Sequence, residues 1–321
     1  MHSPADQAEL MLSRWLSILF TLLFVAAAAW LVHEGREFVP SLSQIKWGYG
    51  VPLVCAALAY AVFQGFLLRD ILQPERIALT ASEHFGCSVV TTLWNYIFPF
   101  SGFAFRGLYL KRIHGFEYAR FIGSTSALFI VEIFVFSALG LLCMALLGFA
   151  MLEQGYVTLT VLGGAFAGSL FICIFRIRVP VFLGAIGRKV EGVLDAVYTL
   201  LARPAVFFRA VGWTAAIFVA YALMYWFSAA MMDLELPVLA TGVFSALTDL
   251  ALLFRIAPAA AGTYDASVML VAAEFGFNLT QGLLLAFLVR LSQLSVAFTA
   301  GVWFHFVLSR RMATVNSGGV V

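Results

Sequence analysis

Pro99-Phe-Ser-Gly102-Phe-Ala-Phe-Arg106 is the stretch that decides the fold, because the second half of the chain carries a counterpart of opposite charge, Pro258-Ala-Ala-Ala-Gly262-Thr-Tyr-Asp265. In each stretch a charged residue lies seven positions after the proline. The opposite charge follows later in the chain, as Glu132 in the first half and Arg290 in the second. A segment broken by proline and glycine that recurs in both halves is the best sequence pointer to a transporter's binding site.

The composition indicates a membrane protein. Of the 321 residues, 63% are hydrophobic and 11% are charged, and the mean hydropathy is +0.98. Soluble domains are about one quarter charged. Long apolar stretches run over most of the sequence, which predicts a single all-α transmembrane domain over residues 1–321. The net charge of +2 is too small to suggest binding to nucleic acid.

The sequence carries no signature of an enzyme, a metal site or a cofactor. The five histidines and four cysteines are scattered without the spacing of metal ligands. Nucleotide-binding loops, the serine hydrolase motif and the zinc protease motif are absent from the sequence. We therefore expect a non-enzymatic protein without cofactors.

Six apolar segments are long enough to cross a bilayer, and two further regions are broken in the middle. The six are Trp15–Val32, Tyr49–Leu68, Phe121–Phe149, Val157–Phe175, Val211–Met232 and Leu279–Leu308. The broken regions, 77–110 and 238–275, carry Pro99 and Pro258, and proline disfavours helix at and just before its position. We predict that each broken region forms a re-entrant hairpin of two shorter helices.

Lysine and arginine gather in alternate connections, which predicts the orientation. The positive-inside rule assigns the basic connections to the cytoplasm, so both termini are expected there. Repeat 1 (about 15–150) and repeat 2 (about 157–309) then have the same order of elements and opposite orientations. This is the pattern of an inverted-repeat transporter. The region near 179–202 predicts an amphipathic helix on the cytoplasmic face, or a plain connecting helix.

The charged residues of the two stretches are the candidates for substrate binding. The Arg106 guanidinium can hold a phosphate through two hydrogen bonds; alternatively it forms an ion pair with Glu132 that locks two helices together. Asp265 and Arg290 form the mirrored pair. Asp265 contacts a cationic or hydroxyl-bearing part of a substrate, or it only holds Arg290 in place. Arg255, on the helix before the second break, either reaches the cavity or pairs with a nearby aspartate.

Uncharged residues near the breaks complete the candidate site. Asn95 precedes the first break and either lines the site or forms a hydrogen bond between helices. Gly102 and Gly262 permit close backbone approach and unusual dihedral angles. The amides freed at the following helix N-termini would favour an anion, which again points to a phosphate-bearing ligand.

At these residues the chain resembles the lysylphosphatidylglycerol synthase transmembrane, or flippase-like, family. The segment Asn95–Arg106 is similar to the family's first motif, an asparagine followed by proline, glycine and arginine. The segment Pro258–Asp265 is similar to the second, although Ala261 replaces one of its paired glycines and Asp265 replaces its usual glutamate. The resemblance implies lipid handling. Because the sequence ends at Val321, we expect a stand-alone member without the aminoacyl-transfer domain.

The leading hypothesis is a carrier in the bacterial cytoplasmic membrane that moves a phosphate-bearing lipid between leaflets. One alternative keeps the cavity and changes the cargo to a polyprenyl-phosphate sugar or another isoprenoid or hopanoid lipid. Another is a non-transporting accessory subunit of a lipid-modifying enzyme. The expected partners are a membrane lipid and such an enzyme, while the oligomeric state is left open.

The predicted orientation can be tested by labelling single cysteines in intact cells, in a variant without the native cysteines. A cysteine at Glu153 is expected to react with an impermeant thiol probe from outside, and one at Arg188 is expected to be protected. The opposite pattern at both positions would disprove the inverted repeat.

Overall fold

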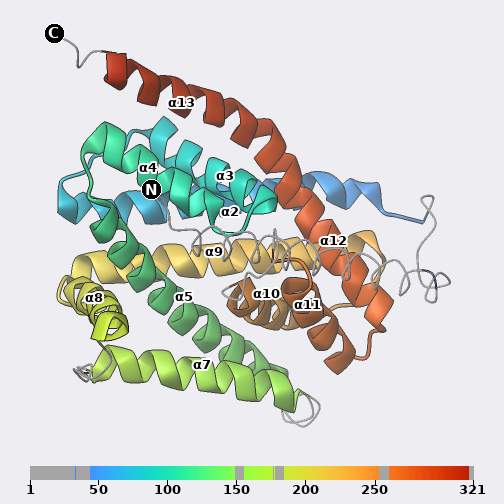
Figure 1. Ribbon diagram of the computed structural model, residues 1–321. Coiled ribbons are helices and arrows are strands. Elements are labelled where there is room, and N and C mark those ends of the chain that lie inside the picture. Colours follow the sequence, from blue (N-terminus) through green and yellow to red (C-terminus); the bar gives the residue numbers. More distant parts are fainter. Residues whose placement is uncertain are drawn as a thin grey trace, which may run out of the picture.

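The computed structural model describes residues 33, 44–148, 155–175, 177, 184–252 and 260–317, and the described elements are helices (Figure 1). The α-helices are α2 Gly50–Leu72, α3 Ala81–Ile97, α4 Ser101–His114, α5 Tyr118–Leu147, α7 Tyr156–Ile174, α8 Gly184–Leu201, α9 Pro204–Met231, α10 Val238–Leu252, α11 Thr263–Glu274, α12 Leu279–Val296 and α13 Val302–Ser317. The short elements are the 3-10 turns η2 Trp47–Tyr49 and η3 Gln73–Glu75 and the π-helical turn η6 Ala297–Gly301.

Five of the six expected spans are confirmed as helices long and apolar enough to cross a membrane. They are Trp47–Glu75, Tyr118–Leu147, Tyr156–Ile174, Pro204–Met231 and Leu279–Thr314. The sixth expected span, 15–32, lies outside the described residues. The protein is therefore an all-α, multi-pass membrane protein.

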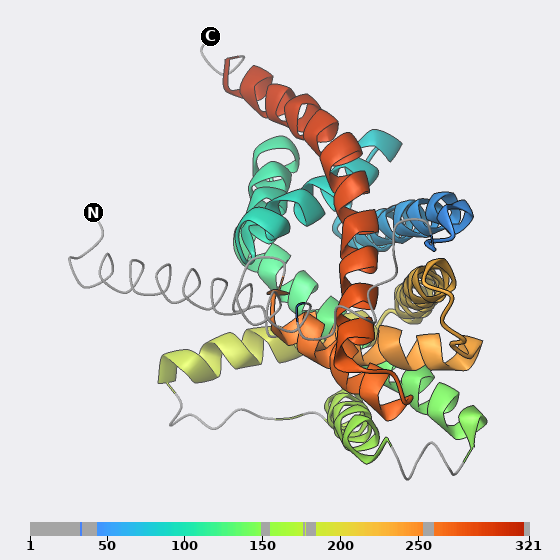
Figure 2. The same ribbon diagram turned by 90° about the vertical axis from the view of Figure 1, so that its right-hand side faces the viewer.

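The last of these spans is longer than the sequence indicates. The π-helical turn η6 joins α12 to α13, so that the three elements form one long rod (Figure 1). In Figure 2 this rod passes α3 and α4 in its upper half. Gly301 in η6 allows the rod to approach the α3 backbone, since a Cβ there would lie 3.0 Å from the Val89 carbonyl oxygen.

Both broken regions fold into pairs of short helices, as expected. In the first region, α3 ends at Ile97 and α4 begins at Ser101 after the left-handed residue Phe100, whose φ is 60°. In the second, α10 ends at Leu252 and α11 begins at Thr263 after Gly262, whose φ is 87°. Pro258 lies outside the described residues.

The two halves of the chain pack reciprocally around a central contact between α2 and α9. The first hairpin packs through α3 on α2, and the second packs through α10 on α9. Helix α5 from the first half packs on α10, while the rod from the second half packs on α3. This exchange is the arrangement that an inverted repeat predicts; the symmetry axis itself stays a prediction.

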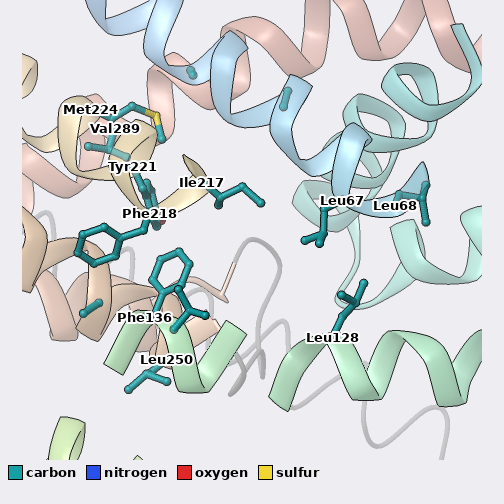
Figure 3. Packing of buried hydrophobic residues seen from close by; sticks show 14 of the residues in the cluster. Leu67, Leu68, Leu128, Phe136, Ile217, Phe218, Tyr221, Met224, Leu250 and Val289 are labelled. Carbon is teal, nitrogen blue, oxygen red and sulfur yellow. The ribbon is translucent and has the colours of Figure 1, made fainter. Parts of the chain in front are cut away.

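Apolar side chains fill the contact between α5, α9 and the second hairpin. Phe136 of α5 meets Phe218 of α9 edge to face, with ring centroids 5.4 Å apart, and Leu250 lies next to them (Figure 3). Both phenylalanines are buried. Edge-to-face pairs add about 0.5–1.5 kcal/mol beyond the burial of their area.

The connections that were assigned to the cytoplasm lie together at one end of the molecule, where ion pairs link them to one another. Buried Asp70 binds Arg69 at 2.9 Å and accepts a 3.0 Å hydrogen bond from Trp213 Nε1 on α9. Glu75 lies 3.8 Å from Arg120 and 3.7 Å from Arg203. These contacts join the end of α2 to the starts of α5 and α9.

Glu83 ties the base of the first hairpin to the C-terminal rod at the same end. Its carboxylate accepts a 2.7 Å hydrogen bond from the Tyr109 hydroxyl on α4 and lies 3.4 Å from His114 Nε2. Arg311 of α13 lies 3.6 Å away. The positive charges of this end are evident in the sequence, whereas the buried acids Asp70 and Glu83 were not predicted.

Two further contacts involve the connections assigned to the outside, and the first of them lies at the opposite ends of α2 and α9. Lys46, before α2, binds Asp233, after α9, at 2.6 Å, and this hydrogen bond raises the pKa of Lys46. Glu274, at the end of α11, accepts a hydrogen bond from the Thr158 amide at the start of α7. Each hairpin therefore has its base at a different end of the molecule.

Helix α8 accounts for the predicted amphipathic segment near 179–202. It begins at Gly184, and residues 178–183 lie outside the described part of the chain. The helix packs mainly on α5, with further contacts to α7 and α9. Its position relative to a membrane surface stays a prediction.

The first hairpin should be intolerant of a side chain at Gly102, because a Cβ there would overlap the carbonyl oxygen of Thr91. We expect Gly102→Ala to lower the free energy of unfolding by about 1–3 kcal/mol or more, as for other overpacked sites. Gly163→Ala in α7 is the matched control, since nothing lies within 4 Å of a Cβ there. Equal thermal midpoints of the two variants in detergent would contradict the close approach.

Candidate functional site

Arg106 is held inside the first hairpin. It lies on α4 and is only 6% exposed. Its Nε donates a 3.1 Å hydrogen bond to Thr91 Oγ1 on α3, and its guanidinium lies 5.6 Å from the centre of the Phe103 ring. The Thr91 hydroxyl in turn donates to the Cys87 carbonyl at 2.6 Å. The hairpin thus positions a buried cation one and a half turns after its break.

Arg106 lines a cavity with an empty volume of about 620 Å³, which we call the Arg106 chamber. Two carboxylates, Glu132 of α5 and Asp249 of α10, line the same chamber. It therefore draws its charged groups from both halves of the chain. The uncharged polar side chains around it include Gln64, Ser88, Thr91, Thr92, Asn95 and Thr125. The pairing of Arg106 with Glu132 stays a prediction.

The mirrored ion pair of the second half is confirmed. Arg290 Nη2 on α12 lies 2.8 Å from Asp265 Oδ2 on α11. The same carboxylate oxygen accepts a 3.0 Å hydrogen bond from the Gly262 amide at the start of α11. The Arg290 guanidinium also lies 4.5 Å from the centre of the Tyr264 ring, within the range of a cation–π contact. Asp265 therefore both caps the helix and compensates a partly buried cation.

Arg290 lines a second cavity, the Arg290 chamber, with an empty volume of about 480 Å³. The residues around it are polar and aromatic: Tyr60, Thr92, Asn95, Tyr96, Tyr264 and Gln293. Tyr60, Thr92, Asn95 and Leu252 line both chambers, so the two adjoin.

Asn95 lines both chambers and also forms a hydrogen bond within the first hairpin. Its Oδ1 accepts a 3.0 Å hydrogen bond from the Gly102 amide, across the first break. Both readings of Asn95, as a lining residue and as a hydrogen-bonding link, therefore apply. Gly102 is required by the close approach of α3, and Gly262 by its positive φ. Arg255 lies outside the described residues.

Several neutral polar residues of the chambers were not predicted from the sequence. Tyr60 and Gln64 lie four residues apart on α2, and Arg290 and Gln293 lie three apart on α12. Residues at these spacings share one helix face. A search for polar side chains on one face of an apolar helix would have found them.

Among the residues that the structure describes, no group of three or more histidine, cysteine, aspartate or glutamate side chains is placed to hold a metal ion.

The helices and chambers define a multi-pass membrane protein with a polar interior. The chain belongs to the family described as the lysylphosphatidylglycerol synthase TM region, which it matches over residues 15–301. This match confirms the resemblance seen in the two motifs. Comparisons with curated proteins and with solved structures found no match.

A double-mutant cycle can measure the coupling free energy between Asp265 and Arg290. Asp265→Ala is expected to lower the free energy of unfolding by about 3–5 kcal/mol, because it leaves the Arg290 guanidinium uncompensated in the interior. The double variant Asp265→Ala with Arg290→Leu should lose less than the sum of the two single changes. Asp265→Asn should fall between, since an amide oxygen still caps Gly262. Losses that add to within about 0.5 kcal/mol would contradict energetic coupling.

Proposed function

We propose that this protein binds a phosphate-bearing membrane lipid in the Arg106 chamber and carries its headgroup between the two leaflets. The observation that carries the proposal is the placement of Arg106, a buried guanidinium that lines a cavity beside a broken helix. Arginine can bind a phosphate with two parallel hydrogen bonds and stays charged at any depth. Ionisable residues inside a membrane protein mark function by default.

Two carboxylates, those of Glu132 and Asp249, line the same chamber as Arg106 and repel a phosphate. A phosphate that binds Arg106 therefore takes the place of protein carboxylates at the guanidinium, and the carboxylates favour a cationic or hydroxyl-bearing part of the headgroup. Broken helices at membrane depth are tolerated where they line a cavity. The family's description names a synthase of a modified phospholipid, which supports a phospholipid as the ligand.

We further propose that the protein is a carrier and not an enzyme, located in the bacterial cytoplasmic membrane with both termini in the cytoplasm. The separation of connections into an arginine-rich end and an end with Lys46 and Asp233 supports this orientation. An enzyme that modifies the lipid is the proposed protein partner.

Substitutions at Arg106 test the proposal. Arg106→Lys keeps the charge but loses the two-pronged geometry, so we expect lipid translocation to fall about tenfold or more, and Arg106→Ala to fall at least as far. Arg112→Lys on the exposed side of the same helix is the matched control. The measurement is the translocation of a fluorescent phospholipid in vesicles that contain the purified protein, with folding checked by size exclusion.

The exchange Arg106→Glu with Glu132→Arg separates a lipid-binding role from a structural lock. A lock would tolerate the exchange, and recovered translocation would assign Arg106 to the scaffold. Vesicles without any translocation by the unaltered protein would instead favour the accessory subunit.

A further inference from the structure

A lipid that binds in the Arg106 chamber has to bring its headgroup in from the bilayer while its acyl chains stay outside. The described side chains that line the chamber are mainly polar or charged, and its empty volume is about 620 Å³. Moving acyl chains from the hydrocarbon of the bilayer into such a space is costly, because each methylene group favours apolar surroundings. The headgroup therefore needs an opening between two helices that leads from the chamber to the apolar exterior.

The wall of the Arg106 chamber is least tightly packed between α4 and α5. Its described residues come from α2, α3, α4, α5 and α10. Helix α3 packs closely on α2 and on α4, and α5 packs closely on α10, whereas α4 and α5 make few contacts with each other. They touch near the turn that joins them, where a Cβ on Gly107 would lie 2.5 Å from the Tyr118 ring. Figure 1 shows the two helices leaving this turn at an angle, so this seam can open with the least loss of packing.

Two phenylalanine rings close the seam between α4 and α5. Phe103 of α4 and Phe129 of α5 meet edge to face, with ring centroids 5.5 Å apart. Both rings line the Arg106 chamber, and both residues are partly exposed. Ile122 lies two turns before Phe129 on the same face of α5 and is 48% exposed. Ala104, next to Phe103, is exposed as well. The pair of rings therefore separates a polar chamber from an apolar outer surface.

The charged residues of the chamber lie directly behind these rings. Arg106 follows Phe103 by three residues on α4, and its guanidinium lies 5.6 Å from the centre of the Phe103 ring. Glu132 follows Phe129 by three residues on α5 and lines the same chamber. Residues three apart share one helix face. A headgroup that passes between the two rings therefore meets Arg106 and Glu132 first.

We infer that Phe103 and Phe129 form a lateral gate, through which the headgroup enters the Arg106 chamber from the bilayer when α4 and α5 separate. This inference rests on the proposed function and adds the route of the lipid and the part of the protein that moves. Opening exchanges the contact between the two rings for contacts with acyl chains, which are equally apolar, so the rings lose little on separation.

Covalent bridging of α4 to α5 tests the gate. In the full chain without its native cysteines, the double variant Phe103→Cys with Phe129→Cys is bridged by a bifunctional methanethiosulfonate, which a reductant removes. We expect bridging to lower the translocation of a fluorescent phospholipid in vesicles about tenfold or more, and the reductant to restore it. The matched control is Phe134→Cys with Phe166→Cys, which joins α5 to α7 across a ring pair 5.4 Å apart. Bridging there should change translocation less than about twofold.

A second measurement does not depend on lipid transport and remains informative if the double variant fails to fold. Ser88 of α3 lines the Arg106 chamber and is 3% exposed. In the same background, the thiol of Ser88→Cys should react with a bilayer-soluble maleimide about threefold faster or more when Phe129→Ala removes one ring of the gate. Phe134→Ala, which removes a ring from the α5–α7 contact, is the matched control and should leave the rate unchanged.

The outcomes separate this inference from the proposed function. Unimpaired translocation after bridging, with translocation weakened by Arg106→Lys, would overturn the gate and leave the phosphate site standing. Equal maleimide rates in Phe129→Ala and Phe134→Ala would also overturn the gate. An equal loss of translocation with the monofunctional methyl methanethiosulfonate would show that added bulk and not restrained motion blocks the protein, which contradicts the gate. Absence of translocation by the unaltered protein would overturn the proposed function and this inference together.

Discussion

The structure depends on how it satisfies the backbone where helices break inside an apolar protein. Each break frees amide groups from the helical hydrogen-bond pattern, and an amide left without a partner in an apolar surrounding costs several kcal/mol. At the first break the Gly102 amide donates to Asn95 Oδ1, and at the second the Gly262 amide donates to Asp265 Oδ2. Because these two hydrogen bonds hold the hairpins in shape, they also fix the walls of both chambers.

In the two hairpins, the residue that accepts the hydrogen bond from the freed amide lies at different positions relative to the break. This difference determines which charged side chains remain to line each chamber. In the first hairpin the capping group comes from Asn95, before the break, so that the charged residue after the break, Arg106, contributes to the cavity. In the second hairpin Asp265, the counterpart of Arg106, is itself the cap and also compensates Arg290. A similar arrangement of helices thus produces two different chambers. The Arg106 chamber is lined by several charged side chains, whereas at the Arg290 chamber the charge of Arg290 is compensated by Asp265.

Hydropathy and the positions of proline and glycine were sufficient to predict the five described spans and the two pairs of short helices, because length and helix breaking depend on local sequence. The opposite charges and their spacing predicted the contact between Asp265 and Arg290. The contacts of Gln293, Asp70 and Glu83 were not predicted. Most of the long helices are apolar on every side, so hydropathy does not reveal which face turns inward. Arg106 meets Thr91 only because α3 and α4 cross closely at Gly102, and that crossing is a tertiary property.

The uneven distribution of ion pairs gives the two ends of the molecule different sensitivities to ionic strength. At one end, Asp70 and Glu83 are nearly inaccessible, and added salt screens such contacts little. At the other, the described ion pair is Lys46 with Asp233, whose side chains are 51% and 72% exposed. An exposed pair contributes little to stability and weakens in salt. Rising salt concentration would therefore loosen the junction between α2 and α9 at the Lys46 end first, while the arginine-rich end keeps its contacts.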